Sequence, residues 1–505
     1  MLRASSCLSL LALTSLISLI DAATLFAGGT VIAWDQSAQR LDILRNGSVL
    51  VEDDSITTVF SGSYNGTLPH DLDVVDATND IISTGFIDTH RHSWQTAFKT
   101  LGSNTTLMRY FERYGTSSPA SRLFTPEDVY IGQLVGMLEA LNGGVTTIVD
   151  FPHCAWSAAH SKAALDATFE SGVRTEWAYN FGSYKNFTFD AQVELFQDLV
   201  ADQRFSNSST RLGISYDGFN TAEQNQTRKI LDLARESNVS VVTTHANGGV
   251  YGAKNFPSLL HNTFSFLNQS IPIIFAHASY HTPTDAQLLR QHNHYISTTP
   301  ESEMHYGHLH PNSHLILDQS ALGIDTHFTF SSDVLTQARL WLQSVRKIFY
   351  REVIDRRELP AENPMSATQA FLLATRNGAL ALRRSDIGVL CAGAKADLLV
   401  WNGRAPSLLG WTDPVAAVVL HANVGDIKHV MVGGEFRKKD GVLTVDGYER
   451  LQDRFLESAR RIQGIWREME LPVTLGEAQN GVQFETPMRA DVEQGEGDGY
   501  GELFI

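Results

Sequence analysis

Short apolar runs alternate with longer helix-like stretches through the middle of the chain, and this alternation limits the fold more than any other feature. Because the runs are rich in β-branched residues and the intervening stretches are long enough for helices, the pattern indicates parallel strands joined by helices. One helix is expected at 126–141, where Asn142-Gly143-Gly144 follows as a stop signal. The eight apolar runs are 81–87, 145–150, 173–180, 212–216, 239–244, 271–276, 295–299 and 328–332.

Eight parallel strands close into a barrel, which carries its chemistry at the carboxyl ends of the strands. We therefore predict an α/β fold with a TIM-like (β/α)8 barrel over residues 81–387; a doubly wound open sheet is the alternative. The flanks 24–80 and 388–445 carry short strand-like runs between turn residues. Since each flank alone is too small to bury the face of a sheet, the two are expected to form one small β-domain. Residues 446–505 are expected to form a charged helix and an acidic tail.

The first 23 residues have the pattern of a secretory signal peptide. Arg3 precedes an apolar run at 8–20, and Asp21-Ala22-Ala23 follows. An uncleaved anchor is the alternative, but the run is shorter than the about 20 residues that span a bilayer. Eight Asn-x-Ser/Thr acceptors predict a secreted or secretory-pathway glycoprotein with its sugars before residue 269. These acceptors are Asn46, Asn65, Asn104, Asn186, Asn207, Asn225, Asn238 and Asn268.

The charge balance and the cysteines exclude several classes of protein. With 56 acidic and 39 basic side chains the net charge is −17, so the surface repels phosphate backbones and anionic lipids. We expect no nucleic-acid partner and, after signal removal, no membrane; a small-molecule substrate and a homo-oligomer remain compatible with the sequence. Only three cysteines occur, so no disulfide framework exists. Cys154 and Cys391 are expected to be buried thiols rather than a bridge.

Histidines and one carboxylate recur at the ends of the predicted barrel strands. His90 and His92 end the first run, and alternate residues of an extended chain project to one side. His245 and His277 end the fifth and sixth runs, and Asp333 follows the eighth. Imidazoles with a carboxylate suit zinc, and also iron or manganese, with one position left open for water. The sequence therefore predicts one bound divalent ion.

The loop after the seventh run holds further histidines whose role stays open between a second metal site and a polar lid over the pocket, which is favoured. They are His305, His308, His310 and His314.

Six motifs together resemble the amidohydrolase superfamily: GFIDTHRH, NGGVTTIVD, TTH, FAH, SSD and the closing GVLCAGAKADLLVW. The resemblance covers nearly the whole mature chain and is greatest to the branch of cytosine deaminase and the triazine hydrolases. It implies a metal-dependent barrel with a small β-sandwich built from both chain ends. It also implies that His277 polarises the substrate or is an additional ligand. The residues that it assigns to the metal are His90, His92, His245 and Asp333.

The sequence departs from this branch at two positions. The fourth run, LGISYDG, has no lysine that could be carbamylated to hold a second ion, so one metal is favoured. The glutamate expected three residues after His245 is replaced by Gly248. Some other group must then move the proton, and Glu301 and Glu303 after the seventh run are the candidates; helix capping or exposure is the alternative for each.

These observations predict a secreted metal-dependent hydrolase that attacks a non-peptide carbon–nitrogen bond of a small cyclic amide, amidine or heterocycle. Asp333 would take the proton of the activated water, and His277 would stabilise the developing oxyanion. Aromatic residues in the loops favour a flat substrate. A decarboxylase or dehalogenating hydrolase of the same superfamily is the second hypothesis, and an inactive barrel scaffold is the third.

Overall fold

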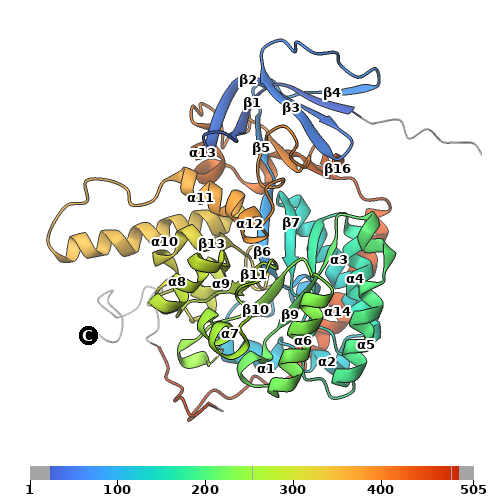
Figure 1. Cartoon of the computed structure of the whole chain (residues 1–505), viewed down its shortest axis with the longest axis vertical. Helices are drawn as coiled ribbons and strands as arrows, with labels where there is room; N and C mark the ends of the chain where they lie inside the picture. The colour runs from blue at the N-terminus through green and yellow to red at the C-terminus, as the bar shows by residue number, and fades with distance from the viewer. Residues whose placement is uncertain (1–22, 253, 479, 488–505) are drawn as a thin grey trace, which may run out of the picture.

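The computed structural model of the 505-residue chain describes residues 23–252, 254–478 and 480–487 (Figure 1). The predicted signal peptide lies outside the described residues except for Ala23, which opens the first strand. The last part of the predicted acidic tail, 488–505, also lies outside them.

Eight parallel strands form the barrel, as predicted, and they follow one another around it in chain order. The ends of this sheet meet where Ile324 N–H donates to the His90 carbonyl at 3.0 Å and His92 N–H donates to the Asp325 carbonyl at 3.1 Å. The strands are β6 (Phe86–Arg91), β7 (Val145–Asp150), β8 (Arg174–Phe181), β9 (Arg211–Tyr216), β10 (Val242–His245), β11 (Ile273–Ala276), β12 (Tyr295–Thr298) and β13 (Ser320–Leu322).

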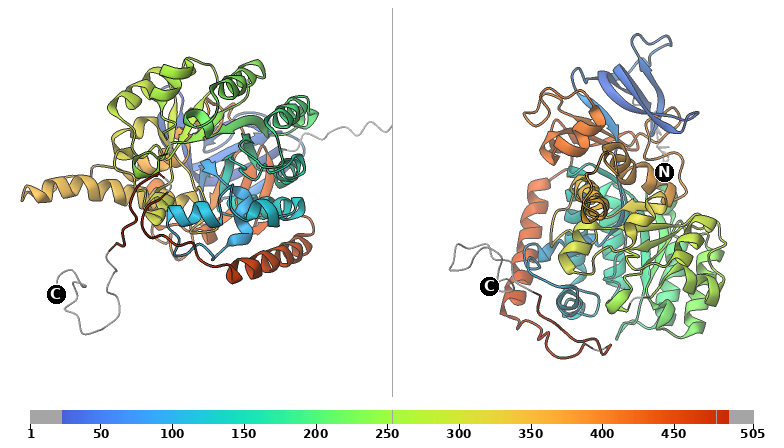
Figure 2. Two further views of the ribbon diagram at one scale, coloured as in Figure 1. Left: turned by 90° about the horizontal axis from the view of Figure 1, so that it is seen from below. Right: turned by 90° about the vertical axis from the view of Figure 1, so that its left-hand side faces the viewer.

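Helices surround these strands (Figure 2). The helix predicted before Asn142 is α3, which starts at a capping box between Thr125 and Asp128 with Pro126 at its first position. The chain turns from α3 into β7 at Gly144, whose φ is 83°. The main barrel helices are α3 (Pro126–Asn142), α4 (Ala158–Ser171), α5 (Phe189–Val200), α6 (Gln224–Glu236), α7 (Pro257–Phe264), α8 (Pro283–His292), α9 (Pro300–Tyr306) and α10 (Val334–Asp355).

Both flanks of the barrel join in one second sheet of nine mostly antiparallel strands, as predicted. β5, which directly follows the first flank, pairs with β14 from the second, in the register Thr84 with Leu398. The sheet consists of β1 (Ala23–Asp35), β2 (Arg40–Glu52), β3 (Ser55–Ser61), β4 (Leu72–Asp76), β5 (Ile81–Thr84), β14 (Leu398–Trp401), β15 (Ile427–Val432), β16 (Glu435–Lys439) and β17 (Val442–Leu443).

Two predicted barrel strands need correction. The first run is divided at Gly85, where a Cβ would lie 2.1 Å from the Thr146 hydroxyl. Its first half is β5 of the second sheet, and only its second half enters the barrel. The eighth strand is the three-residue β13, not 328–332. The 328–332 run is β-branched and aromatic and therefore resembles a strand, but it leads into the cap of α10.

The helix predicted after the second flank is α14 (Tyr448–Glu468), which packs on the barrel. The Ser458 hydroxyl donates to the Asp128 carboxylate at 2.6 Å, and the buried Trp466 indole donates to the Arg113 carbonyl at 2.9 Å. Beyond α14 the chain reaches the loop at Val250, whose carbonyl accepts a hydrogen bond from Asn480.

Cys154 and Cys391 are buried free thiols, as predicted. None of the helices among the described residues has both the length and the apolar character that crossing a membrane requires.

Candidate metal centre

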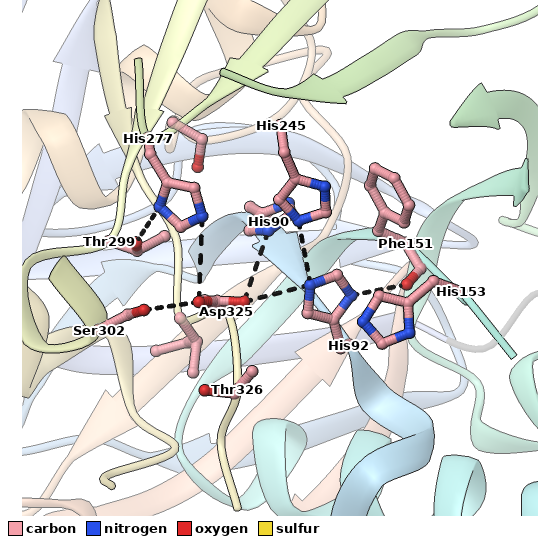
Figure 3. A network of polar contacts seen from close by, with 12 residues as sticks. His90, His92, Phe151, His153, His245, His277, Thr299, Ser302, Asp325 and Thr326 are labelled. Atoms are coloured by element: carbon pink, nitrogen blue, oxygen red, sulfur yellow. Dashed lines mark hydrogen bonds and ion pairs between the residues drawn. The ribbon is translucent and has the colours of Figure 1, made fainter. Parts of the chain in front are cut away.

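Four side chains meet at the carboxyl ends of the barrel strands, and we call them the His₃Asp cluster (Figure 3). Their nearest ligand atoms all lie within 4.8 Å of one another. The Asp325 Oδ1 lies 3.1 Å from the His92 Nε2 and 3.6 Å from the His90 Nε2. The cluster consists of His90 and His92 from β6, His245 at the end of β10, and Asp325 three residues after β13.

The hydrogen bonds of the cluster leave its Nε2 atoms free to bind an ion. The His92 Nδ1 lies 2.8 Å from the Phe151 carbonyl, and the His245 Nδ1 lies 2.8 Å from the Asp217 Oδ2. These oxygens only accept, so each Nδ1 carries the hydrogen and each Nε2 presents a lone pair. The two Nε2 atoms lie only 3.3 Å apart. Two unprotonated Nε2 atoms this close are arranged as two ligands of one cation would be.

His90 supports the same conclusion. Its ring is fully buried, and neither ring nitrogen has a hydrogen-bond partner among the described residues. Burial lowers the pKa of His90 well below its usual value, so the ring is neutral and can act as a ligand. An orphaned neutral imidazole inside a set of histidines and a carboxylate fits zinc, iron or manganese.

Asp325 is held as an ionised carboxylate. Burial alone would raise its pKa, but the surrounding histidine rings, His90 and His92 above all, outweigh burial and keep the pKa of Asp325 well below its usual value. The Ser302 hydroxyl donates to its Oδ2. At His245, burial would lower the pKa, but the Asp217 carboxylate outweighs it and raises the pKa of that ring. Asp217 therefore orients His245 and makes it more basic.

The structure does not bring Asp333 to the cluster, which corrects the predicted ligand set. Asp333 caps α10, where its carboxylate accepts hydrogen bonds from the Thr336 N–H at 2.7 Å and the Thr336 hydroxyl at 2.9 Å. Its Cβ lies 3.5 Å from where a Cβ on Gly143 would be, beside the amino end of β7. Because β13 lies before the run predicted as the eighth strand, the carboxylate that follows the strand is Asp325.

His277 lies at the edge of the cluster, after β11. Its Nε2 is 4.0 Å from the Asp325 Oδ2, and its Nδ1 is 2.9 Å from the Thr299 hydroxyl (Figure 3). His277 and Ala278 have φ values of 66° and 48°, a left-handed backbone conformation that residues other than Gly rarely adopt. Two consecutive strained residues at a strand end turn the ring toward Asp325.

The two candidate acids do not face the cluster directly. Glu301 accepts hydrogen bonds from Ser331 and Gln337 and so points toward α10. Glu303 lies behind His277, with its Oε1 3.5 Å from the His277 Nδ1. Glu303 can therefore reach the reaction only through His277.

Gly248 cannot be replaced by a glutamate in this backbone. Its φ of 71° and ψ of −158° belong to a region that only glycine adopts. A Cβ there would lie 2.6 Å from the Phe256 ring and 3.0 Å from Tyr280. The local fold therefore excludes a carboxylate side chain at position 248.

Sequence reasoning missed Asp217 and His153 as well as Asp325. The His153 ring stacks on His92 with centroids 3.9 Å apart, and its Nδ1 accepts a hydrogen bond from the Trp94 indole at 3.0 Å. Asp217 directly follows the fourth predicted run and His153 closely follows the second. Their position after strands was the signal that could have found them.

A cavity of about 560 Å³ borders the cluster at the ends of β8 and β9. His153 and Asp217, which contact the ligands His92 and His245, form part of its wall. Asn180 and Tyr184 line it as well, so the wall offers both hydrogen-bonding and aromatic groups. This size and lining suit a small polar molecule.

The loop histidines do not form a second metal centre among the described residues, where the His₃Asp cluster is the one group of suitable ligands. His305 contacts the Gly102 carbonyl, His310 contacts Ser344, and the His308 ring lies 4.8 Å from the His277 ring. Most of the loop aromatics pack against each other: Trp94, Tyr110, Tyr114, Trp156 and Tyr306 are buried, whereas Phe111 is exposed.

Comparisons with known proteins agree with this architecture. The Amidohydrolase family matches residues 81–437. A 5-methylthioadenosine/S-adenosylhomocysteine deaminase of Pyrococcus abyssi is 25% identical over 457 residues, covering 87% of this chain and 99% of that protein. An adenosine deaminase of Xanthomonas campestris with bound zinc has a TM-score of 0.73 at 16% identity, covering 89% and 99% of the two chains. An atrazine chlorohydrolase of Arthrobacter aurescens TC1, complexed with zinc, has a TM-score of 0.69 at 17% identity, covering 86% and 100%.

Proposed function

Because the chain belongs to the amidohydrolase family, we propose that it hydrolyses a non-peptide carbon–nitrogen bond in a small heterocycle or cyclic amide. The observation that carries this proposal is the His₃Asp cluster, in which orphaned and facing imidazole nitrogens surround one ionised carboxylate. The cluster would hold one divalent ion, and zinc, iron and manganese all suit its ligands.

An ion bound there would lower the pKa of a water ligand to about 7 and would polarise the substrate. The chain supplies the proton transfers. Asp325 is ionised, and its Oδ2 lies on the side of His277, so it is placed to take a proton from the attacking water. The His277 Nε2 faces the same space and is placed to hydrogen bond to the oxygen on which negative charge develops.

The departing nitrogen needs a proton as its bond to carbon breaks. Since Gly248 cannot carry a glutamate, Asp325 has to return the proton that it took. The water oxygen bonds to carbon as Asp325 takes the proton; when Asp325 returns that proton to the nitrogen, the carbon–nitrogen bond breaks and the nitrogen leaves as ammonia or an amine. One carboxylate thus serves as base and then as acid.

The substrate that we propose is an aminated heterocycle. The relative in Pyrococcus abyssi is named a deaminase of adenosine derivatives, and the cavity beside the cluster has a volume suited to a molecule of this class. Asn180 and Asp217 in its wall could recognise ring nitrogens and amino groups.

Hydrolytic removal of a halide is a second candidate. The observation that favours it is Gly248, because a halide leaves without being protonated and needs no dedicated acid. The product separates the two reactions.

The test is to incubate the purified metal-loaded protein with aminated purines, pyrimidines and triazines, cyclic amides and chlorinated triazines. We expect ammonia or amine from at least one nitrogen substrate with the wild type and none with Asp325→Asn. Halide release without ammonia would favour the second candidate. If the metal-loaded protein transforms no compound of either kind, the proposed chemistry is wrong.

We also propose that the protein is secreted and glycosylated. The asparagines of all eight acceptor motifs are exposed, whereas Asn180, Asn247 and Asn255, which lack the motif, are buried. Treatment of the protein from the culture medium of a eukaryotic host with a peptide N-glycosidase should lower its mass. An unchanged mass, or retention inside the cell, would contradict this proposal.

A further inference from the structure

Glu303 is a carboxylate buried between two imidazoles. It lies in α9 with an exposed fraction of 0%. Its Oε1 is 3.5 Å from the His277 Nδ1, and its Oε2 is 3.5 Å from the His310 Nδ1. The far side of His310 lies 2.7 Å from the Ser344 hydroxyl on α10. Glu303 therefore connects the edge of the metal centre to the helix behind it.

The charge of Glu303 has to be balanced by these rings. A carboxylate without exposure is costly unless it is paired, and among the described residues no lysine or arginine forms an ion pair with it. Burial opposes its ionisation, but hydrogen bonding with His277 and His310 outweighs burial and lowers the pKa of Glu303 to about 2. The carboxylate is thus ionised and needs an N–H on the face of each imidazole that it meets.

The surrounding backbone fixes the same arrangement. The Thr299 N–H donates to the Glu303 Oε1 at 3.0 Å, and the Thr299 hydroxyl lies 2.9 Å from the His277 Nδ1. The main-chain N–H of His277, the strained residue directly after β11, donates to the Ser297 carbonyl at 2.8 Å. Glu303 and Thr299 both contact the His277 Nδ1 and thereby fix the orientation of the ring.

We propose that Glu303 is a positioning residue, which holds the His277 Nδ1–H and thereby directs the His277 Nε2 toward Asp325 and the reacting group. The inference rests on the proposed function, because it takes His277 as the group that contacts the substrate. Glu303 does not touch the substrate itself. It orients the His277 ring, and its negative charge stabilises the doubly protonated ring, in which Nδ1–H faces Glu303 and Nε2–H can donate to a developing oxyanion.

Kinetics of three variants test this role. Glu303→Gln keeps the shape but removes the charge, Glu303→Asp keeps the charge, and Glu301→Gln is the matched control because Glu301 faces α10. We expect Glu303→Gln to lower kcat about 100-fold or more with little change in KM, since orientation and charge act in the transition state. Glu303→Asp should recover part of the loss, and Glu301→Gln should remain near wild type. The metal content of each variant separates this effect from loss of the ion.

A spectroscopic measurement tests the inference without any substrate. In zinc-loaded protein labelled with ¹⁵N-histidine, the His277 ring is assigned by its absence in His277→Asn, a residue that tolerates the left-handed backbone. We expect His277 to carry a proton on Nδ1 in the wild type and this signal to move in Glu303→Gln.

The outcomes distinguish the inference from the proposed function. If the wild type transforms no substrate, the proposed function fails, while the protonation of His277 still tests Glu303. If the wild type is active but Glu303→Gln has a normal kcat, or if the His277 Nδ1 carries no proton, Glu303 does not position His277. Should Glu303→Gln fail to fold, the wild-type spectrum alone decides between these results.

Discussion

Asp325 contacts His92 twice. Its Oδ1 lies 3.1 Å from the His92 Nε2, and its main-chain carbonyl accepts a hydrogen bond from the His92 N–H at 3.1 Å. The second contact closes the barrel between its first and last strands, and the first brings the carboxylate to the histidines. Closure of the barrel and assembly of the metal centre therefore depend on the same pair of residues.

Removing the charge of Asp325 should abolish turnover, whereas removing that of Asp333 should not. Asp325→Asn loses both a ligand and the base, so activity should fall below detection. Asp333→Asn keeps a side-chain oxygen at the helix cap, where Asn and Asp are about equally favourable, so it should leave both stability and kcat near wild type. Steady-state kinetics and thermal unfolding check both variants. An inactive but folded and metal-replete Asp333→Asn would restore the role first predicted for that residue.

Asp217 should control metal affinity through His245. Asp217→Asn leaves the four ligands in place but removes the carboxylate that orients the His245 ring. Loss of such a partner typically weakens metal binding about 10-fold to 100-fold. Competition with a chelator measures this affinity, and Asp190→Asn, an exposed carboxylate at the start of α5, is the control. Equal affinities of the two variants would show that Asp217 does not support the site.

Gly248 should tolerate substitution much less than a glycine with a similar φ in open space. Gly248→Ala combines a positive φ with a Cβ 2.6 Å from Phe256, and we expect it to cost about 2 to 4 kcal/mol. Gly62→Ala has a φ of 74° but meets no atom within 4 Å, so it should cost only about 1 kcal/mol. Urea unfolding compares the two. Similar costs would mean that crowding at Gly248 is relieved by movement of the neighbouring rings.

The sequence was sufficient to predict the barrel, the joining of both flanks and three of the four residues that meet in the His₃Asp cluster. His90, His92 and His245 end apolar runs that are strands, so their position followed from periodicity. Asp325 follows a strand of only three residues, which is too short to give a periodic signal. Because the run 328–332 resembles a strand, the sequence instead predicted Asp333 as the carboxylate after the last strand. The contact of Glu303 with His277 depends on the packing of α9 against the end of β11, which no local pattern encodes.

Acid should destabilise the fold partly through His294, outside the metal centre. Its Nδ1 accepts from the Ile273 N–H and its Nε2 donates to the Leu267 carbonyl, so the ring is neutral. Burial lowers the pKa of His294 to about 3, against 6.5 for an exposed ring. Below pH 6.5, His294 binds a proton in the unfolded chain but stays neutral in the folded chain. The free energy of unfolding therefore falls as the pH drops from 6.5 toward 3.

The pH dependence of the free energy of unfolding is the quantity to measure. His294 should contribute about 1.4 kcal/mol per pH unit in that range. Urea unfolding at several pH values should therefore give a shallower dependence for His294→Gln than for the wild type. His261→Gln, which changes an exposed ring, should keep the wild-type slope. Identical slopes for all three proteins would show that His294 titrates normally in the fold.

The account rests on one ion being held by the His₃Asp cluster, and metal analysis of the dialysed wild type beside His90→Asn tests this most directly. We expect about one zinc, iron or manganese ion per chain in the wild type and a small fraction of that in the folded variant. A wild type that hydrolyses its substrate without bound metal, or a variant that retains as much metal as the wild type, would contradict the account.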